Sequence, residues 1–283
     1  MRNERYIPYL LILPSVFFLL FFFAWPLVEA LLLAVRGSSG RWTLEHFQRM
    51  AGDLYFRDAL RNTVLLAVVI VPLQVILALG MSLLLSGISW GRDLFLYVWT
   101  IPLGISDLAA GIVWLAIFTE RGYLNSFLQA LGLIQTPQLW LSYETPLTLF
   151  LSVVVAEVWR ATAIVFVILV AGLQLIPKEY GEAAEVFGAT PWQRFVRVTL
   201  PLLRPSLQVA LILRTILALE VFAVVVALGG RNLPVLAGEA YYWYSAYQNA
   251  GVAAAYAALI LGVSVLATFF YLRLVRTRTE AAP

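Results

Sequence analysis

Several ionisable side chains stand inside otherwise apolar stretches of the chain, among them Asp107, Glu157, Arg160, Arg214 and Glu220. A charge surrounded by hydrocarbon is costly, so such residues usually pair with one another or contact a solute. Glu157 and Arg160 are three residues apart and can pair on one helix face. Arg214 and Glu220 lie about 240° apart on a helical wheel and are not expected to pair. Two interpretations stay open: an ion pair that joins helices, or polar groups along a solute pathway.

The composition excludes several other chemistries. The chain has no cysteine, which excludes disulfides, thiolate metal sites and cysteine nucleophiles, and its one histidine, His46, excludes a multi-histidine metal site. We therefore expect no catalytic residue and no metal site. The net charge of +3 is too small to indicate a nucleic-acid partner. Hydrophobic residues make up 62% of the chain and charged residues only 12%, against about 25% charged in an average soluble domain, so the expected surroundings are a lipid bilayer.

The apolar runs predict an all-α, integral membrane bundle of about six transmembrane helices. A span needs about 20 mostly apolar residues. The first run is too long for a signal-peptide core and is interpreted as a retained span, and Pro72 and Pro102 are expected to kink the second and third. The six runs are Tyr9 to Val35, Thr63 to Leu85, Leu96 to Phe118, Pro146 to Leu169, Pro205 to Leu228, and Gly251 to Leu274.

The distribution of positive charge favours both termini inside the cell, although the bias is weak. In that orientation the segment from Lys178 to Arg204 is cytoplasmic. Pro177 can open a helix there, and Gly188 stands where a helix commonly ends in a left-handed residue. Thr190 and Gln193 then form a T-x-x-Q capping box for a second helix. The segment is therefore predicted to be a helix-turn-helix at the membrane surface, and an amphipathic hairpin without a partner is the simpler alternative.

The same segment resembles the signature loop of binding-protein-dependent ABC importer permeases. The resemblance rests on Glu182-Ala183-Ala184, Gly188-Ala189 and Val198-Thr199-Leu200-Pro201 at the family's spacing. Further similarity to the carbohydrate branch (maltose, trehalose and glycerol-phosphate type) lies in Gly172 to Pro177, Asn62-Thr63 and Pro72 to Gln74. Phe187 departs from the aspartate of many sugar permeases, and Glu220-Val221-Phe222 departs from a pattern in which an aspartate follows an aromatic residue.

The resemblance implies a non-catalytic subunit of an ATP-driven sugar importer in a bacterial or archaeal cytoplasmic membrane. The implied partners are a second, different permease, two ATP-binding cassette subunits, an extracytoplasmic solute-binding protein and a mono- or oligosaccharide. ATP and magnesium would belong to the ATPase subunits, so no cofactor is expected on this chain. The segment 177–204 would be the coupling helix, in which Glu182 contacts the ATPase, Ala183 and Ala184 pack closely and Gly188 permits the turn. Ala189, Leu200 and Pro201 complete the coupling motif.

Sugar recognition needs hydrogen-bonding groups and an aromatic platform. Candidates for the substrate pathway are Asn62, Gln74, Asp107, Glu157, Trp159, Arg160 and Glu220. For each of Asn62, Gln74 and Trp159, helix packing is the competing interpretation. The aromatic cluster Tyr241 to Tyr244, with Tyr247, is expected to anchor the chain at the membrane interface, with contact to the solute-binding protein as the alternative.

The expected organisation has three parts. Residues 1–61 form an N-terminal transmembrane helix and outer loop, residues 62–276 the permease core, and residues 277–283 a cytoplasmic tail. Three competing functions stay open. An importer of an amino acid, polyamine or phosphonate would keep the class and change the cargo. A membrane enzyme would need a polar catalytic cluster, and a channel or secondary transporter would leave the coupling loop unexplained.

Overall fold

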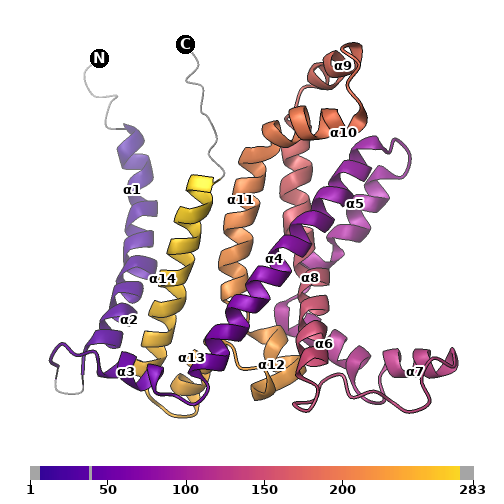
Figure 1. The fold of residues 1–283 in the computed structure, drawn as a ribbon. Helices are drawn as coiled ribbons and strands as arrows, with labels where there is room; N and C mark the ends of the chain where they lie inside the picture. The colour runs from indigo at the N-terminus through magenta and orange to yellow at the C-terminus, as the bar shows by residue number, and fades with distance from the viewer. Residues whose placement is uncertain (1–6, 38–39, 275–283) are drawn as a thin grey trace. The chain divides into compact units, whose positions relative to one another are not determined.

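The structure of the protein is a computed structural model that describes residues 7–37 and 40–274, and these residues are almost entirely helical (Figure 1). Within the described residues the only β-bridge joins Arg36 and Trp42. The helical elements, in chain order, are α1 Ile7–Leu19, η2 Leu20–Ala24, α2 Trp25–Val35, α3 Glu45–Ala51, α4 Phe56–Gly87, α5 Arg92–Thr100, η3 Ile101–Gly104, α6 Asp107–Phe118, α7 Tyr123–Ala130, α8 Pro146–Gln174, α9 Lys178–Val186, α10 Pro191–Arg194, η4 Phe195–Thr199, α11 Leu200–Leu219, α12 Ala223–Gly229, η5 Gly230–Asn232, α13 Leu236–Ser245 and α14 Ala250–Leu274.

The chain divides into two compact units. The first comprises residues 1–57 and 239–261, and the second comprises residues 58–238 and 262–283. Within the first unit, the carboxylate of Asp53 accepts hydrogen bonds from Trp243 Nε1 at 2.6 Å and from the Tyr256 hydroxyl at 3.0 Å. Part of the predicted aromatic cluster is therefore held to its own unit by a polar contact. The predicted domain boundaries stay predictions, and the predicted tail at 277–283 lies outside the described residues.

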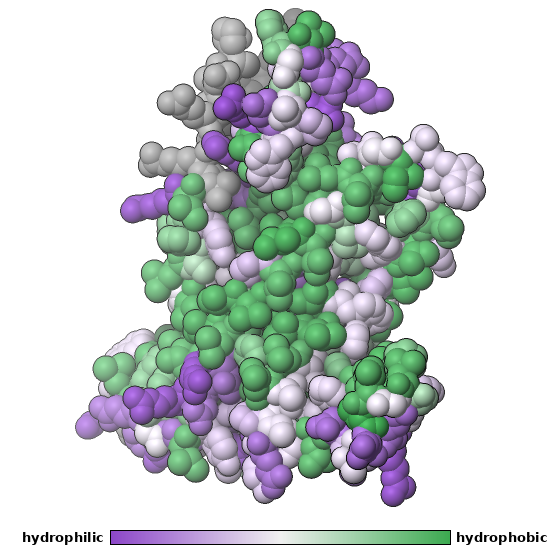
Figure 2. All heavy atoms as spheres, turned by 45° about the vertical axis from the view of Figure 1, so that its right-hand side comes forward, coloured by the Kyte–Doolittle hydropathy of each residue, from purple (hydrophilic) through white to green (hydrophobic). Residues whose placement is uncertain are grey.

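Five of the six predicted spans are present as long apolar helical segments. They are Ile7–Val35, Phe56–Gly87, Pro146–Gln174, Pro191–Leu219 and Ala250–Leu274. The first of them buries none of its apolar window, so its side chains are available to lipid. In the face shown in Figure 2, hydrophobic side chains cover the middle and hydrophilic side chains gather toward the ends, as expected of a bilayer-spanning protein.

The third predicted span, Leu96 to Phe118, is broken rather than continuous. Two helical segments, Arg92–Gly104 and Asp107–Ala130, are bent by 100° relative to each other. Pro102 has no N–H to continue the helix, Ile105 is extended, and Ser106 caps the new helix by accepting a hydrogen bond from Ala109 N at 3.3 Å. The expected kink at Pro102 is therefore a full break, whereas α4 continues through Pro72 as one helix.

The fifth predicted span, Pro205 to Leu228, is wrong at its C-terminal end. The helix ends at Leu219, with the exposed Glu220 as its C-cap, and α12 begins separately at Ala223. α12 packs against α6 at very short range because Gly111 has no side chain. A Cβ atom on Gly111 would lie 2.6 Å from the Cβ of Ala227, so this close packing of the short helix on α6 depends on the glycine.

The core of the second unit is formed around α4 and α8. One buried cluster joins these helices to α12 through residues such as Leu66, Val153 and Val224. The other joins them to α11 through residues such as Ala78, Phe166 and Leu203. These clusters fix α4, α8 and α11 against one another, and α8 leads directly into the polar segment that contains α9 and α10 (Figure 1).

Candidate functional site: a surface hairpin and a buried charge network

The first arm of the hairpin is α9, and a Schellman motif ends it. Gly188 has φ +77°, a left-handed conformation that costs glycine little. Its N–H donates to the Glu185 carbonyl at 2.9 Å, and Ala189 N–H donates to the Ala184 carbonyl at 2.9 Å. The predicted helix end at Gly188 is confirmed, and two otherwise unpaired carbonyls of α9 are satisfied.

The second arm begins with the predicted capping box. Gln193 N–H donates to Thr190 Oγ1 at 3.3 Å, and Thr190 N–H donates to Gln193 Oε1 at 2.9 Å. Pro191 occupies the first helical position, where a missing N–H leaves no hydrogen bond unmade. An ion pair between Arg194 and Glu185 joins the two arms. In the hairpin, the end of the first helix and the start of the second are therefore both capped, and an ion pair links the two helices.

The outer surface of the hairpin combines a carboxylate with large apolar side chains. Val186 and Phe187 are 85% and 90% exposed, and Trp192 is also exposed. Glu182 is exposed and has no ion pair with any other described residue. Exposed apolar residues at a surface turn indicate an interaction site. The remaining residues of the predicted coupling motif follow the same segment: Ala183 is exposed, and Ala184, Ala189, Leu200 and Pro201 are half-buried.

The second arm runs without a break into a long membrane helix. α10, the π-helical turn η4 and α11 follow one another directly and form the continuous segment Pro191–Leu219. Pro201 has no N–H to donate to the carbonyl of Arg197, which accounts for a widened turn just before it. The second arm of the hairpin and the charged residue Arg214 in α11 therefore belong to one helical segment.

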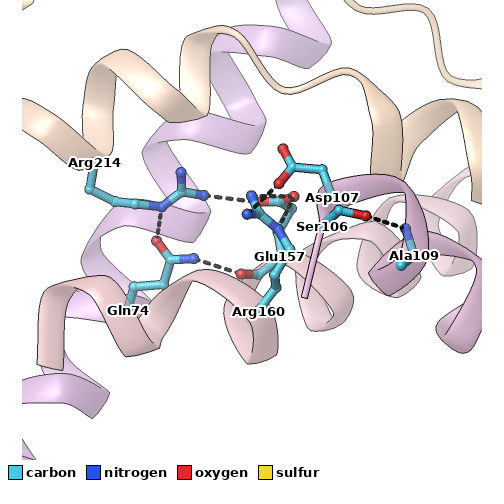
Figure 3. A network of polar contacts seen from close by, with 7 residues as sticks. All are labelled: Gln74, Ser106, Asp107, Ala109, Glu157, Arg160 and Arg214. Carbon is cyan, nitrogen blue, oxygen red and sulfur yellow. Dashed lines mark hydrogen bonds and ion pairs between the residues drawn. The ribbon is translucent and has the colours of Figure 1, made fainter. Parts of the chain in front are cut away.

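A polar network lies in the core where α4, α8 and α11 meet (Figure 3). Arg214 Nη2 contacts Glu157 Oε2 at 2.8 Å, and Arg214 Nε donates to Gln74 Oε1. Gln74 Nε2 donates in turn to the backbone carbonyl of Glu157 at 2.8 Å. Glu157 and Arg214 have side chains that are 1% exposed, so each charge needs the other as its partner.

The network extends from the core toward a more exposed end on α6. Arg160 Nη2 contacts Glu157 Oε2 at 3.1 Å, which confirms the predicted pair, and Arg160 Nη1 contacts Asp107 Oδ1 at 2.7 Å. The side chains of Arg160 and Asp107 are 13% and 56% exposed. The two carboxylates balance the two guanidinium groups. The network thus joins the buried Arg214 to the partly exposed Asp107 through alternating charges.

The structure brings together four of the predicted pathway residues, Gln74, Asp107, Glu157 and Arg160, and leaves the other three outside the network. Asn62 donates to the Pro234 carbonyl at 3.0 Å and lies about 18 Å along α4 from Gln74. Glu220 is an exposed helix cap. Trp159 contacts Trp114 edge to face, with ring centroids 5.9 Å apart.

Sequence reasoning noted Arg214 as a charge within a span but did not assign it to the site. Its partners Gln74 and Glu157 lie 140 and 57 residues away along the chain. The one available signal was that a guanidinium in an apolar helix must find a carboxylate, and Glu157 is such a residue. Nη1 of Arg214 is buried and has no hydrogen-bond partner among residues 7–37 and 40–274.

An aromatic cavity lies beside this network. Its volume is about 330 Å³, and Trp99, Trp159 and Thr162 are among the residues that line it. None of the network residues lines this cavity, and Trp159 and Arg160, although consecutive on α8, point about 100° apart around the helix. Within the described part of the chain, no group of three or more histidine, cysteine, aspartate or glutamate side chains could hold a metal ion.

The comparisons with known proteins agree with this geometry. The family described as the inner-membrane component of binding-protein-dependent transport systems matches residues 77–280, a range that contains the hairpin and most of the network. The chain belongs to this family. Members are non-catalytic transmembrane subunits of ABC importers. This permease is therefore a multi-pass inner-membrane protein and a non-catalytic subunit.

Two curated relatives transport carbohydrate compounds. The permease is 32% identical to the sulfoquinovosyl glycerol transport permease SmoG of Agrobacterium fabrum, over 83% of this chain and 76% of the relative. It is 33% identical to the trehalose/maltose transport permease MalF of Thermococcus litoralis, over 81% of this chain and 78% of the relative.

A solved structure shows the same fold. A chain of a bacterial ABC transporter that imports the acidic polysaccharide alginate superposes with a TM-score of 0.82 at 21% identity. The match covers 98% of both chains. The all-α membrane fold predicted from the apolar runs is therefore confirmed.

Proposed function

We propose that this permease is one half of the translocation pathway of an ATP-driven sugar importer. The observation that carries the proposal is that one continuous helical segment, Pro191–Leu219, contains both the second arm of a well-formed surface hairpin and Arg214, the most deeply buried cation of the charge network. The relatives described as permeases for trehalose/maltose and for sulfoquinovosyl glycerol support a carbohydrate solute.

The hairpin is the coupling element in this proposal. Glu182 is the exposed anionic contact to an ATP-binding subunit, and the apolar Phe187 and Trp192 enter its surface. Ala183 and Ala184 let the partner approach closely, and the left-handed Gly188 permits the turn. Ala189, Leu200 and Pro201 connect the hairpin to α11, so that displacement of the hairpin by ATP-driven closure moves the membrane helix.

The solute path in this proposal runs beside the charge network. Asp107 and Arg160 offer partly exposed hydrogen-bonding groups to sugar hydroxyls, and Trp159 offers a ring surface in the neighbouring cavity. Glu157 pairs with both Arg160 and Arg214, and Gln74 accepts a hydrogen bond from Arg214, so these two residues fix the positions of the guanidinium groups. Asn62 and Glu220 lie outside the network, and the proposed path beside the network does not use them.

The proposed assembly contains a second, different permease, two ATP-binding subunits that carry ATP and magnesium, and an extracytoplasmic solute-binding protein. A solved complex of the alginate transporter with its pentasaccharide-bound periplasmic protein, 22% identical with a TM-score of 0.81, provides the fold precedent for such a chain. Both termini and the hairpin are cytoplasmic in this arrangement.

The test uses the whole complex, co-expressed with its neighbouring subunits and reconstituted in nanodiscs. ATP hydrolysis is measured with and without the solute-binding protein and a panel of sugars, amino acids, polyamines and phosphonates. We expect stimulation by the binding protein together with one sugar. Stimulation by a non-sugar solute alone would replace the sugar assignment and keep the importer class.

The coupling role is tested with Glu182→Lys, which is expected to abolish stimulation because it reverses the charge of the ATPase contact. The matched control is Glu144→Lys, an equally exposed carboxylate before the start of α8, about 43 Å of helix away from the hairpin. Equal stimulation in the Glu182→Lys complex and the unchanged complex would exclude the hairpin as the coupling element.

A further inference from the structure

A second cavity, not assigned to the transport mechanism, lies at the base of the hairpin. It has a volume of about 360 Å³ and is lined by the end of α4, the start of α5, the end of α8 and the start of α9. Its polar lining consists of Arg92, Lys178, Gln174, Ser82 and Ser86, and the rest is apolar. Both cations face the cavity, and no carboxylate lines it.

The cationic groups of this cavity have no anion within the described residues. Neither Arg92 nor Lys178 forms a salt bridge there, and Arg92 Nε is buried without a hydrogen-bond partner. The two serine hydroxyls are already used, because Ser82 donates to the Leu79 carbonyl at 3.0 Å and Ser86 to the Leu83 carbonyl at 2.7 Å. The donors that remain in the lining are the guanidinium of Arg92, the ammonium of the exposed Lys178 and the amide of the exposed Gln174, and two of these three groups are cationic.

Helix polarity adds to the positive potential. Arg92 is the first residue of α5 and Lys178 the first residue of α9, and the N-caps Gly91 and Pro177 make no side-chain capping bond. A cation at the positive end of a helix is unfavourable, and an anion there is favourable. Asp93 and Glu179 follow in the first turns and offset part of the charge, but neither faces the cavity.

The surface around Arg92 has the character of a membrane boundary. Trp90 is 90% exposed just before α5, and Leu94 and Tyr97 on α5 are exposed as well. Exposed tryptophan and tyrosine side chains favour the level of lipid headgroups. The turn between α4 and α5 lies at the same end of the second unit as α9 (Figure 1), which is the end that carries the coupling hairpin.

We propose that this cavity binds the phosphate of an anionic phospholipid from the cytoplasmic leaflet, with Arg92 and Lys178 as its cationic ligands. Basic pockets between helices on the cytoplasmic side are suited to lipid phosphates. An adjoining cavity of about 460 Å³ shares Lys178 and reaches Gly181 and Arg194 of the hairpin. A lipid seated at Lys178 therefore contacts the base of the coupling element, whichever solute is imported.

The test titrates phosphatidylglycerol, and separately phosphatidylcholine, into the detergent-purified complex and counts bound lipids by native mass spectrometry. The double variant Arg92→Gln/Lys178→Gln is expected to bind phosphatidylglycerol about 25-fold more weakly, since each cation contributes roughly fivefold. Binding of phosphatidylcholine is expected to change little. Unchanged phosphatidylglycerol affinity in this variant would overturn the proposal.

Two further variants separate charge from folding. Arg57→Gln/Arg121→Gln removes the same charge from two exposed arginines outside the cavity and is expected to retain the lipid. Arg92→Lys/Lys178→Arg keeps the charge and is also expected to retain it, so loss of lipid there would show that packing, not charge, holds the lipid. Competition by millimolar inorganic phosphate that fully displaces phosphatidylglycerol would assign the cavity to a soluble anion and refute the lipid assignment.

Discussion

Replacement of Glu157 by glutamine is expected to destabilise the protein strongly because Glu157 is the shared partner of two guanidinium groups. Its carboxylate contacts Arg214 at 2.8 Å and Arg160 at 3.1 Å, and its side chain is only 1% exposed. Removal of one member of a buried ion pair typically costs 3–5 kcal/mol. Since glutamine still accepts one hydrogen bond, and Arg160 keeps Asp107, we expect a loss of about 3 kcal/mol in the free energy of unfolding.

Replacement of Arg214 tests whether Glu157 and Arg214 stabilise the protein as a pair. Arg214→Gln alone is expected to cost a similar amount, since Glu157 then loses its most buried partner. The double variant Glu157→Gln/Arg214→Gln removes both charges and lets two amides pair. It should cost clearly less than the sum of the single variants, with a coupling energy of about 2 kcal/mol.

The free energies are measured by denaturant titration in mixed micelles, followed by circular dichroism, for the four members of this double-mutant cycle. Glu144→Gln, an exposed carboxylate outside the network, is the matched control and should change stability by less than about 0.5 kcal/mol. Strictly additive single variants would refute the interpretation of Glu157 and Arg214 as a coupled pair.

Three further variants test the local geometry. Gly188→Ala is expected to destabilise the end of α9 by about 1 kcal/mol because φ is +77°, which faster hydrogen exchange of the α9 amides would reveal and unchanged exchange would contradict. Thr190→Ala should cost about 1 kcal/mol by removing one half of the capping box, with faster exchange confined to α10, and Thr190→Ser should restore protection. Gly111→Leu should lower the thermal unfolding temperature because a side chain there meets Ala227 at once, whereas Gly80→Leu, where a Cβ meets nothing within 4 Å, should not.

Local sequence signals predicted local structure well. The capping box at Thr190, the left-handed Gly188 and the pair between Glu157 and Arg160 each depend on residues within four positions of one another. Such short-range patterns act through backbone hydrogen bonds and helix geometry, which vary little with context. The signature loop itself was recognised from residue identity and spacing, and its role in coupling stays a prediction.

The continuity of the spans and the pairing of distant charges could not be predicted in the same way. Hydropathy measures how apolar a window is and does not report whether the helix continues, so the break near Pro102 and the helix end at Leu219 were missed. In a membrane every face of a helix is apolar, which removes the periodicity that assigns helix faces in soluble proteins. The contact between Arg214 and Gln74 spans 140 residues and depends on tertiary packing alone.

The π-helical turn Phe195–Thr199 has a consequence for how insertions and deletions are tolerated in this helix. A π turn holds one residue more than the α turn that it replaces. Deletion of one residue from this turn would leave the hairpin and α11 facing the same directions as before. Deletion of one residue within α11 would instead rotate everything on one side of it by about 100°. One-residue deletions should therefore be tolerated better at this turn than within α11, because the π turn can lose a residue without a change in the directions that the hairpin and α11 face.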